Sequence, residues 1–102
     1  MPSLQTGRSN RGYIEIIYSI LDASKDGALR THIMFKCNLN SRQLQQYLQY
    51  LIEKGLLKRD RAPPSSKLEY FTTELGRKYM RAYEELFEIV GRRHPTNLKV
   101  KA

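Results

Sequence analysis

Hydrophobic residues recur at three- and four-residue spacing in four segments of the chain. This spacing predicts amphipathic helices, because residues three and four positions apart lie on one face of an α-helix. Two short stretches between the third and fourth segments alternate in part between β-type and polar residues, as strands do. The expected helices cover about residues 12–23, 30–37, 41–54 and 74–90, and the expected strands cover 56–60 and 68–72.

The stretch between the two expected strands reads RAPPSSK. Proline has no backbone N–H and cannot donate a ladder hydrogen bond, so Pro63 and Pro64 belong at the tip of a hairpin. The pattern therefore predicts a mainly α domain with a small β-hairpin over about residues 56–72 and a last helix that extends the domain.

Polar residues at the helix ends predict where the chain reverses. Asn10 and Thr31 are candidate N-caps of the first and second helices, because their side chains can accept a backbone hydrogen bond. Asn38 suits a left-handed conformation at the end of the second helix, and Asn40 with Gln43 three residues later predicts a capping box. Two helices joined by a three-residue turn are the signature of a helix-turn-helix, and a hairpin directly after the second of them is a wing.

The composition indicates a single basic domain. The chain has 102 residues, which is the usual length of one domain, and 18 Lys and Arg against 10 Asp and Glu leave a net charge of +8. Such an excess attracts polyanions, either nucleic acid or an acidic membrane surface. No apolar run approaches the roughly 20 residues of a membrane helix, and residues 1–12 contain no apolar signal-peptide core. Cys37 is the only cysteine, which excludes an intrachain disulfide and fits a reducing compartment.

Basic residues concentrate in the expected wing and at the chain ends. Residues 54–67 contain five basic residues and one acid, and residues 92–102 form a basic tail without any acid. Residues 1–11 read as a flexible basic arm, which leaves residues 12–91 as the expected domain.

The outward face of the third helix is almost all amide. An amide can donate and accept at once, which suits the N6/N7 edge of adenine, and Arg42 in the first turn can reach guanine or a phosphate. In a helix-turn-helix the N-terminal end of the second helix enters the major groove. The alternative is that glutamine is simply a soluble helix former. The outward positions are Arg42, Gln46, Gln49 and Glu53, flanked by Gln43, Gln45 and Tyr50.

Four stretches resemble a known family: IEIIYSILDAS, GALRTHIMFKCNLNSRQLQQYLQYLIEKGLL, EYFTTELGRKYM and the helix after it. Together they cover roughly residues 13–90. The chain resembles the small archaeal winged-helix proteins that include dimeric chromosomal DNA-binding proteins and predicted transcriptional regulators. The resemblance implies double-stranded DNA binding, a cytoplasmic or nucleoid location, and dimerisation through the C-terminal helix. The third helix would be the recognition helix, with the wing on the DNA backbone or in the minor groove.

Position in the motif and the resemblance define the expected DNA contacts. On and beside the recognition helix they are Asn40, Ser41, Arg42, Gln43, Gln45, Gln46 and Gln49. On the wing and its flanks they are Lys58, Arg59, Arg61, Lys67, Arg30 and Lys36.

The last helix has an apolar face wider than one contact requires. Leu75, Tyr79 and Ala82 are expected to close the core, which leaves the apolar residues further along the helix for a second copy of the chain. The expected dimer interface consists of Tyr79, Tyr83, Leu86, Phe87, Ile89 and Val90.

No catalytic constellation is present in the sequence. His32 and His94 have no metal-ligand spacing, and Cys37 is expected to be a small buried residue. We therefore expect no enzyme activity, no metal, no cofactor, no membrane association and no small-molecule ligand. Two other classes stay open: a winged-helix subunit that docks a protein partner, and an RNA-binding module. A site-specific regulator and a general chromosomal protein also cannot be separated by sequence.

Overall fold

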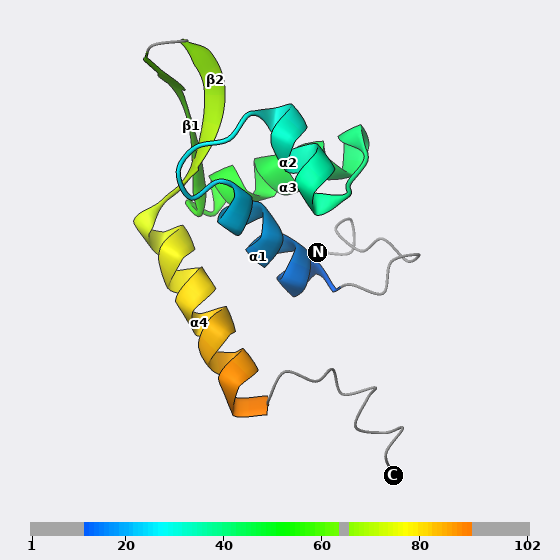
Figure 1. The fold of residues 1–102 in the computed structure, drawn as a ribbon, viewed down its shortest axis with the longest axis vertical. Helices are drawn as coiled ribbons and strands as arrows, with labels where there is room; N and C mark the ends of the chain where they lie inside the picture. Colours follow the sequence, from blue (N-terminus) through cyan, green and yellow to red (C-terminus); the bar gives the residue numbers. More distant parts are fainter. Residues whose placement is uncertain (1–11, 64–65, 91–102) are drawn as a thin grey trace.

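A computed structural model describes residues 12–63 and 66–90 (Figure 1). The first three helices pack together, the β-hairpin projects from one side, and the last helix extends away from the base of the hairpin. The mainly α fold with one small hairpin is therefore confirmed. The elements are α1 (Tyr13–Ala23), α2 (Arg30–Cys37), α3 (Ser41–Glu53), β1 (Leu57–Ala62), β2 (Lys67–Thr72) and α4 (Glu74–Val90).

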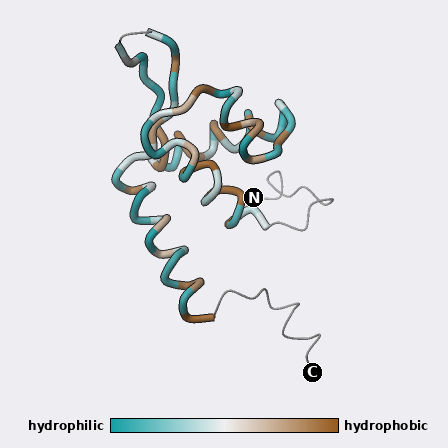
Figure 2. Tube along the Cα trace, in the orientation of Figure 1, coloured by the Kyte–Doolittle hydropathy of each residue, from teal (hydrophilic) through white to brown (hydrophobic). Residues whose placement is uncertain are grey.

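One hydrophobic core joins α1, α2 and α3. Each helix contributes residues at three- and four-residue spacing, and Figure 2 shows hydrophobic positions that recur along the helices instead of forming continuous blocks. Each large side chain buried here contributes roughly 1.5–3 kcal/mol. Cys37 lies in this core, as expected. Its helical members are Ile16, Ile17, Ile20, Leu21, Ile33, Cys37, Leu44, Tyr47, Leu48 and Leu51.

The turn between α2 and α3 has the predicted local chemistry. Asn38 adopts a left-handed conformation with φ 57° and ψ 51°, and Leu39 after it is buried in the core. The Asn40 Oδ1 accepts a hydrogen bond of 2.8 Å from the Gln43 backbone N–H. In return, the Gln43 Oε1 accepts one of 3.1 Å from the Asn40 backbone N–H. The capping box is therefore confirmed, and it sets the start of α3.

The predicted cap of the second helix was wrong. Leu29 is the N-cap of α2, and Thr31 lies inside the helix. The reason is tertiary: Ala28 forms a β-bridge with Tyr70, with N–H···O distances of 3.0 and 2.8 Å, which holds the chain extended until the helix begins. The N-cap of α1 is Gly12, and the candidate Asn10 lies outside the described residues.

The hairpin joins α4 through a tightly packed corner. The Thr73 hydroxyl caps α4 by accepting a 3.0 Å hydrogen bond from the Gly76 N–H, and it donates a 2.6 Å bond to the Gly55 carbonyl oxygen. Gly76 is buried, and a Cβ there would overlap the Leu56 carbonyl oxygen and lie 2.6 Å from the Thr72 Cγ2. This corner therefore accepts only glycine at position 76.

We expect Gly76→Ala to lower the free energy of unfolding by at least about 2 kcal/mol, because backbone cannot move aside as a flexible side chain can. This loss would occur although alanine favours a helix by about 1 kcal/mol over glycine. Urea unfolding followed by circular dichroism measures it. Gly12→Ala is the matched control, since its Cβ meets nothing within 4 Å and should cost less than about 1 kcal/mol. Equal stability of the two variants would contradict this packing.

The rotation of α4 differs from the prediction. Gly76 and Met80 are its buried residues, whereas Leu75 is 50% exposed and Ala82 is exposed. The prediction that Leu75 and Ala82 close the core was therefore wrong. Because Gly76 has no side chain, that side of the helix approaches Leu56 most closely, and the neighbouring apolar stripe turns away from the domain.

Candidate nucleic-acid interface

The outer face of α3 is polar along its length. The opposite face is buried in the core through Leu44, Tyr47, Leu48 and Leu51. No Asp or Glu occurs between Asp26 and Glu53, so α2 and nearly all of α3 lack negative side chains. The exposed residues here are Asn40, Ser41, Arg42, Gln45, Gln46 and Gln49, with Gln43 partly buried beside them.

Arg30 links the starts of α2 and α3. Its Nη2 donates to the Ser41 carbonyl oxygen at 3.0 Å, to the Ser41 Oγ at 3.2 Å and to the Gln45 Oε1 at 3.4 Å. This guanidinium therefore lies at the N-terminal end of α3, beside the residues expected to contact DNA.

Strand alternation divides the wing cations between two faces of the hairpin. Arg59 pairs directly with buried Tyr70, so Arg59 and Arg61 belong to the face that carries the core residues Leu57 and Tyr70. The Arg61 guanidinium also donates a 3.0 Å bond to the Ser66 carbonyl oxygen near the hairpin tip. The other face carries charges of both signs: Lys58, Asp60, Lys67 and Glu69.

A groove of about 250 Å³ runs between α3 and the wing. Arg59 lines it from the hairpin, and the amides of Gln45 and Gln49 line it from the helix. The structure thus brings the recognition-helix residues and one wing arginine together, and leaves Lys58 and Lys67 on the far face. Its lining residues are Gln45, Leu48, Gln49, Ile52, Glu53, Arg59 and Tyr70.

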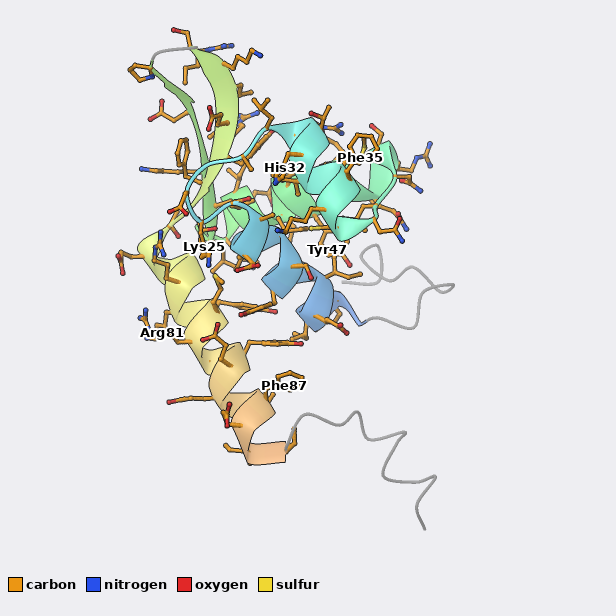
Figure 3. All side chains as sticks on the ribbon, in the orientation of Figure 1. Lys25, His32, Phe35, Tyr47, Arg81 and Phe87 are labelled. Atoms are coloured by element: carbon orange, nitrogen blue, oxygen red, sulfur yellow. The ribbon has the colours of Figure 1, made fainter. Side chains whose placement is uncertain are left out.

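The outer surface of α2 contains a residue that sequence reasoning missed. Phe35 is 80% exposed, and His32 and Lys36 are exposed on the same helix (Figure 3). The helical spacing that directed Ile33 and Cys37 inward also directs Phe35 outward, so the signal was available. An exposed ring beside Lys36 is suited to contact a partner, whereas Arg30 and Lys36 were the residues of this helix expected to do so.

Two of the expected dimer residues pack within the chain instead. The Tyr83 ring stacks on Tyr18 of α1 at 4.4 Å between ring centres, and Phe87 packs against Tyr83 at 5.8 Å. The Tyr18 hydroxyl donates a 2.5 Å hydrogen bond to the Glu84 Oε2, and this bond, with burial, raises the pKa of Tyr18 to about 12. The stack of Tyr83 on Tyr18 and the bond from Tyr18 to Glu84 attach the distal half of α4 to α1.

The exposed side of α4 carries an apolar stripe. Its members follow one another at alternating spacings of four and three residues, which is the repeat of a coiled-coil seam. Leu86 is 56% exposed and Ile89 is 80% exposed, and Val90 is exposed beside them. Ile14 of α1 joins the stripe at a shallow apolar depression of about 170 Å³. We call Leu75, Tyr79, Ala82, Leu86 and Ile89 the α4 stripe.

Tyr79 belongs both to the stripe and to the contact between helices. Its hydroxyl donates a 2.8 Å hydrogen bond to the Ile14 carbonyl oxygen, and its partial burial raises its pKa. Tyr79 therefore orients the stripe with respect to α1.

Within residues 12–63 and 66–90, no group of three or more His, Cys, Asp or Glu side chains is arranged to hold a metal ion. No helix in the same part of the chain is long and apolar enough to cross a membrane.

A helix-turn-helix followed by a two-stranded wing defines the winged-helix class of proteins. Residues 10–91 match the winged helix-turn-helix family, and the chain belongs to it. An uncharacterized protein of Methanocaldococcus jannaschii is 36% identical over 84 residues, which cover 81% of this chain and 80% of that protein.

The solved structures that are similar to this chain include the following two. Sso10a-2, a DNA-binding protein from Sulfolobus solfataricus, has a TM-score of 0.71 and 25% sequence identity, over 89% of this chain and 94% of that one. NMB1585, a MarR family regulator from Neisseria meningitidis, has a TM-score of 0.54 and 19% identity, over 93% of this chain and 73% of that one. The second likeness is one of fold.

Proposed function

We propose that this protein binds double-stranded DNA, with α3 in the major groove and the Arg59 face of the wing against the phosphate backbone. The observation that carries the proposal is the near absence of acids from this surface: α2 and α3 present arginine, lysine and amide groups, and their single acid, Glu53, stands at the far end of α3. Positive groups draw the duplex electrostatically, and an α-helix fits the major groove. The fold similarity to a DNA-binding protein supports the same conclusion.

Variants of helix and wing test these roles. Arg42→Ala and Gln46→Ala should change base preference, by roughly 1–3 kcal/mol at a base that each contacts. Arg59→Ala should instead weaken binding to all sequences alike and reduce the salt slope by about 1. Fluorescence anisotropy with a panel of duplexes measures both effects.

Lys58→Ala is the matched control, because it removes the same charge from the opposite face of the wing. Its effect on affinity should be clearly smaller than that of Arg59→Ala. If the wing variants changed base preference and the α3 variants did not, the two roles would be reversed. Stronger binding to duplex RNA than to duplex DNA would favour the RNA-binding alternative.

We further propose that two copies of the chain pair through the α4 stripe. The stripe is apolar, exposed and spaced as a coiled-coil seam, and a partner helix would remove it from water. A two-fold axis there would present two recognition helices to one duplex. The alternative occupant is a different protein that docks on the same stripe. The nucleoid location stays a prediction. The roles of a specific regulator and of a general chromosomal protein both stay open.

A further inference from the structure

The orientation of three amides at the start of α3 follows from their partners. A backbone N–H can only donate, so the atom that faces it in Asn40 or Gln43 must be the amide oxygen. A guanidinium can also only donate, so the Gln45 atom nearest to Arg30 must be the amide oxygen as well. In all three amides the chain itself uses the oxygen, and the NH₂ group is left for an external partner.

The other polar groups nearby have the same character. Arg42 and Arg30 have only N–H donors. The Ser41 Oγ accepts from Arg30, which directs its own hydrogen elsewhere. The first turns of α3 therefore present donors at almost every polar position, although the residue types alone suggest donors and acceptors together.

We propose that the N-terminal half of α3 reads hydrogen-bond acceptors, and that Gln45, held by Arg30, reads guanine. This inference rests on the proposed DNA binding. Guanine presents two acceptors in the major groove, N7 and O6, whereas adenine presents one acceptor and one donor. To match adenine, an amide must direct its oxygen and its NH₂ at the same base, and in this structure the Gln45 oxygen is directed at Arg30. Adenine reading is thus left to Gln46 and Gln49, whose amides take no part in these bonds.

Arg30 is a positioning residue in this account. Without its guanidinium, the Gln45 amide can turn over and offer its oxygen, so that adenine becomes acceptable at the same base pair. A purely structural role for Arg30 would change affinity or stability without changing which base is selected.

The experiment is selection of binding sites from a random duplex library by the full-length protein, followed by sequencing. Gln45→Ala first identifies the position that Gln45 reads, since preference there should be lost. At this position the wild type should prefer guanine over adenine by at least about fivefold. Arg30→Met should reduce that ratio to near one. Gln45→Glu should move the preference to cytosine, because a carboxylate accepts from the cytosine amino group.

Lys36→Met is the matched control, since it removes one positive charge from the same helix without touching α3 amides, and it should leave the selected base unchanged. Circular dichroism of Arg30→Met should match the wild type, and Arg30→Lys provides a second variant that retains the charge.

Adenine or no preference at the Gln45 position in the wild type would overturn the inference while leaving DNA binding intact. An unchanged guanine preference in the Arg30→Met variant would also overturn the inference while leaving DNA binding intact. A wild-type protein that binds no duplex would overturn the proposed function and this inference with it.

Discussion

The affinity of the protein for duplex DNA is expected to fall about a thousandfold between 50 and 200 mM salt. If about six phosphates are neutralised, the logarithm of the affinity should fall against the logarithm of the salt concentration with a slope near −5. Five of these contacts would come from Arg30, Lys36, Arg42, Arg59 and Arg61, which lie on the described surface around α3 and the wing. Fluorescence anisotropy with a labelled duplex across a salt series measures the slope.

The salt series also separates charge from base contacts. Arg59→Ala should flatten the slope by about one, while Gln46→Ala should leave it unchanged because a neutral amide releases no counterion. No binding at low salt, or an affinity that does not respond to salt, would refute a phosphate-dominated interface.

The second large effect is expected at the α4 stripe. Leu86→Glu with Ile89→Glu should convert a dimer into a folded monomer, because two charges would have to be buried where two apolar side chains contribute roughly 1.5–3 kcal/mol each. Sedimentation equilibrium should give a mass near twice 12.0 kDa for the wild type and near 12.0 kDa for the variant. The monomer should bind DNA at least about 100-fold more weakly, since it loses the second recognition helix.

The choice of residues follows from the structure. Phe87 packs on Tyr83, whose ring stacks on Tyr18 of α1, so its substitution would also disturb contacts within the chain, whereas Leu86 and Ile89 are exposed. Arg81→Glu is the control, because it places a glutamate on an exposed position of α4 outside the stripe (Figure 3). A wild-type mass near 12.0 kDa at micromolar concentration would refute the dimer. A dimeric double variant would place the interface elsewhere.

The sequence allowed the helices and the turn to be predicted to within about one residue, whereas β1 continues to Ala62, two residues beyond its predicted end. The reason is that these features depend on neighbours in the chain: Asn38 tolerates a left-handed backbone, and Asn40 and Gln43 cap each other across three residues. The third helix ends at Glu53, one residue before its predicted end. Hydrophobic periodicity identified the core of α1, α2 and α3 because each of these helices has one apolar face.

The rotation of the last helix and the cap of the second helix could not be predicted, because both depend on contacts between residues that are distant in the sequence. The last helix has two adjacent apolar stripes, and periodicity cannot tell which one faces the domain; the contact of Gly76 with Leu56 makes that choice. Thr31 could not be excluded as a cap without the bridge between Ala28 and Tyr70.

In the candidate interface, too, some features follow from the sequence and others from the packing of distant residues. That the face of α3 is amide-rich, with a single acid, Glu53, at its far end, follows from composition and helical spacing alone. Which atoms of those amides are available to DNA depends on the capping box and on Arg30, which lies 15 residues from Gln45 in the chain. The separation of Arg59 from Lys58 likewise depends on strand pairing, because only the burial of Tyr70 shows which side of the hairpin faces the domain. Neighbouring residues in the sequence thus determine the helices and strands, and their packing determines which face of each one is exposed to solvent.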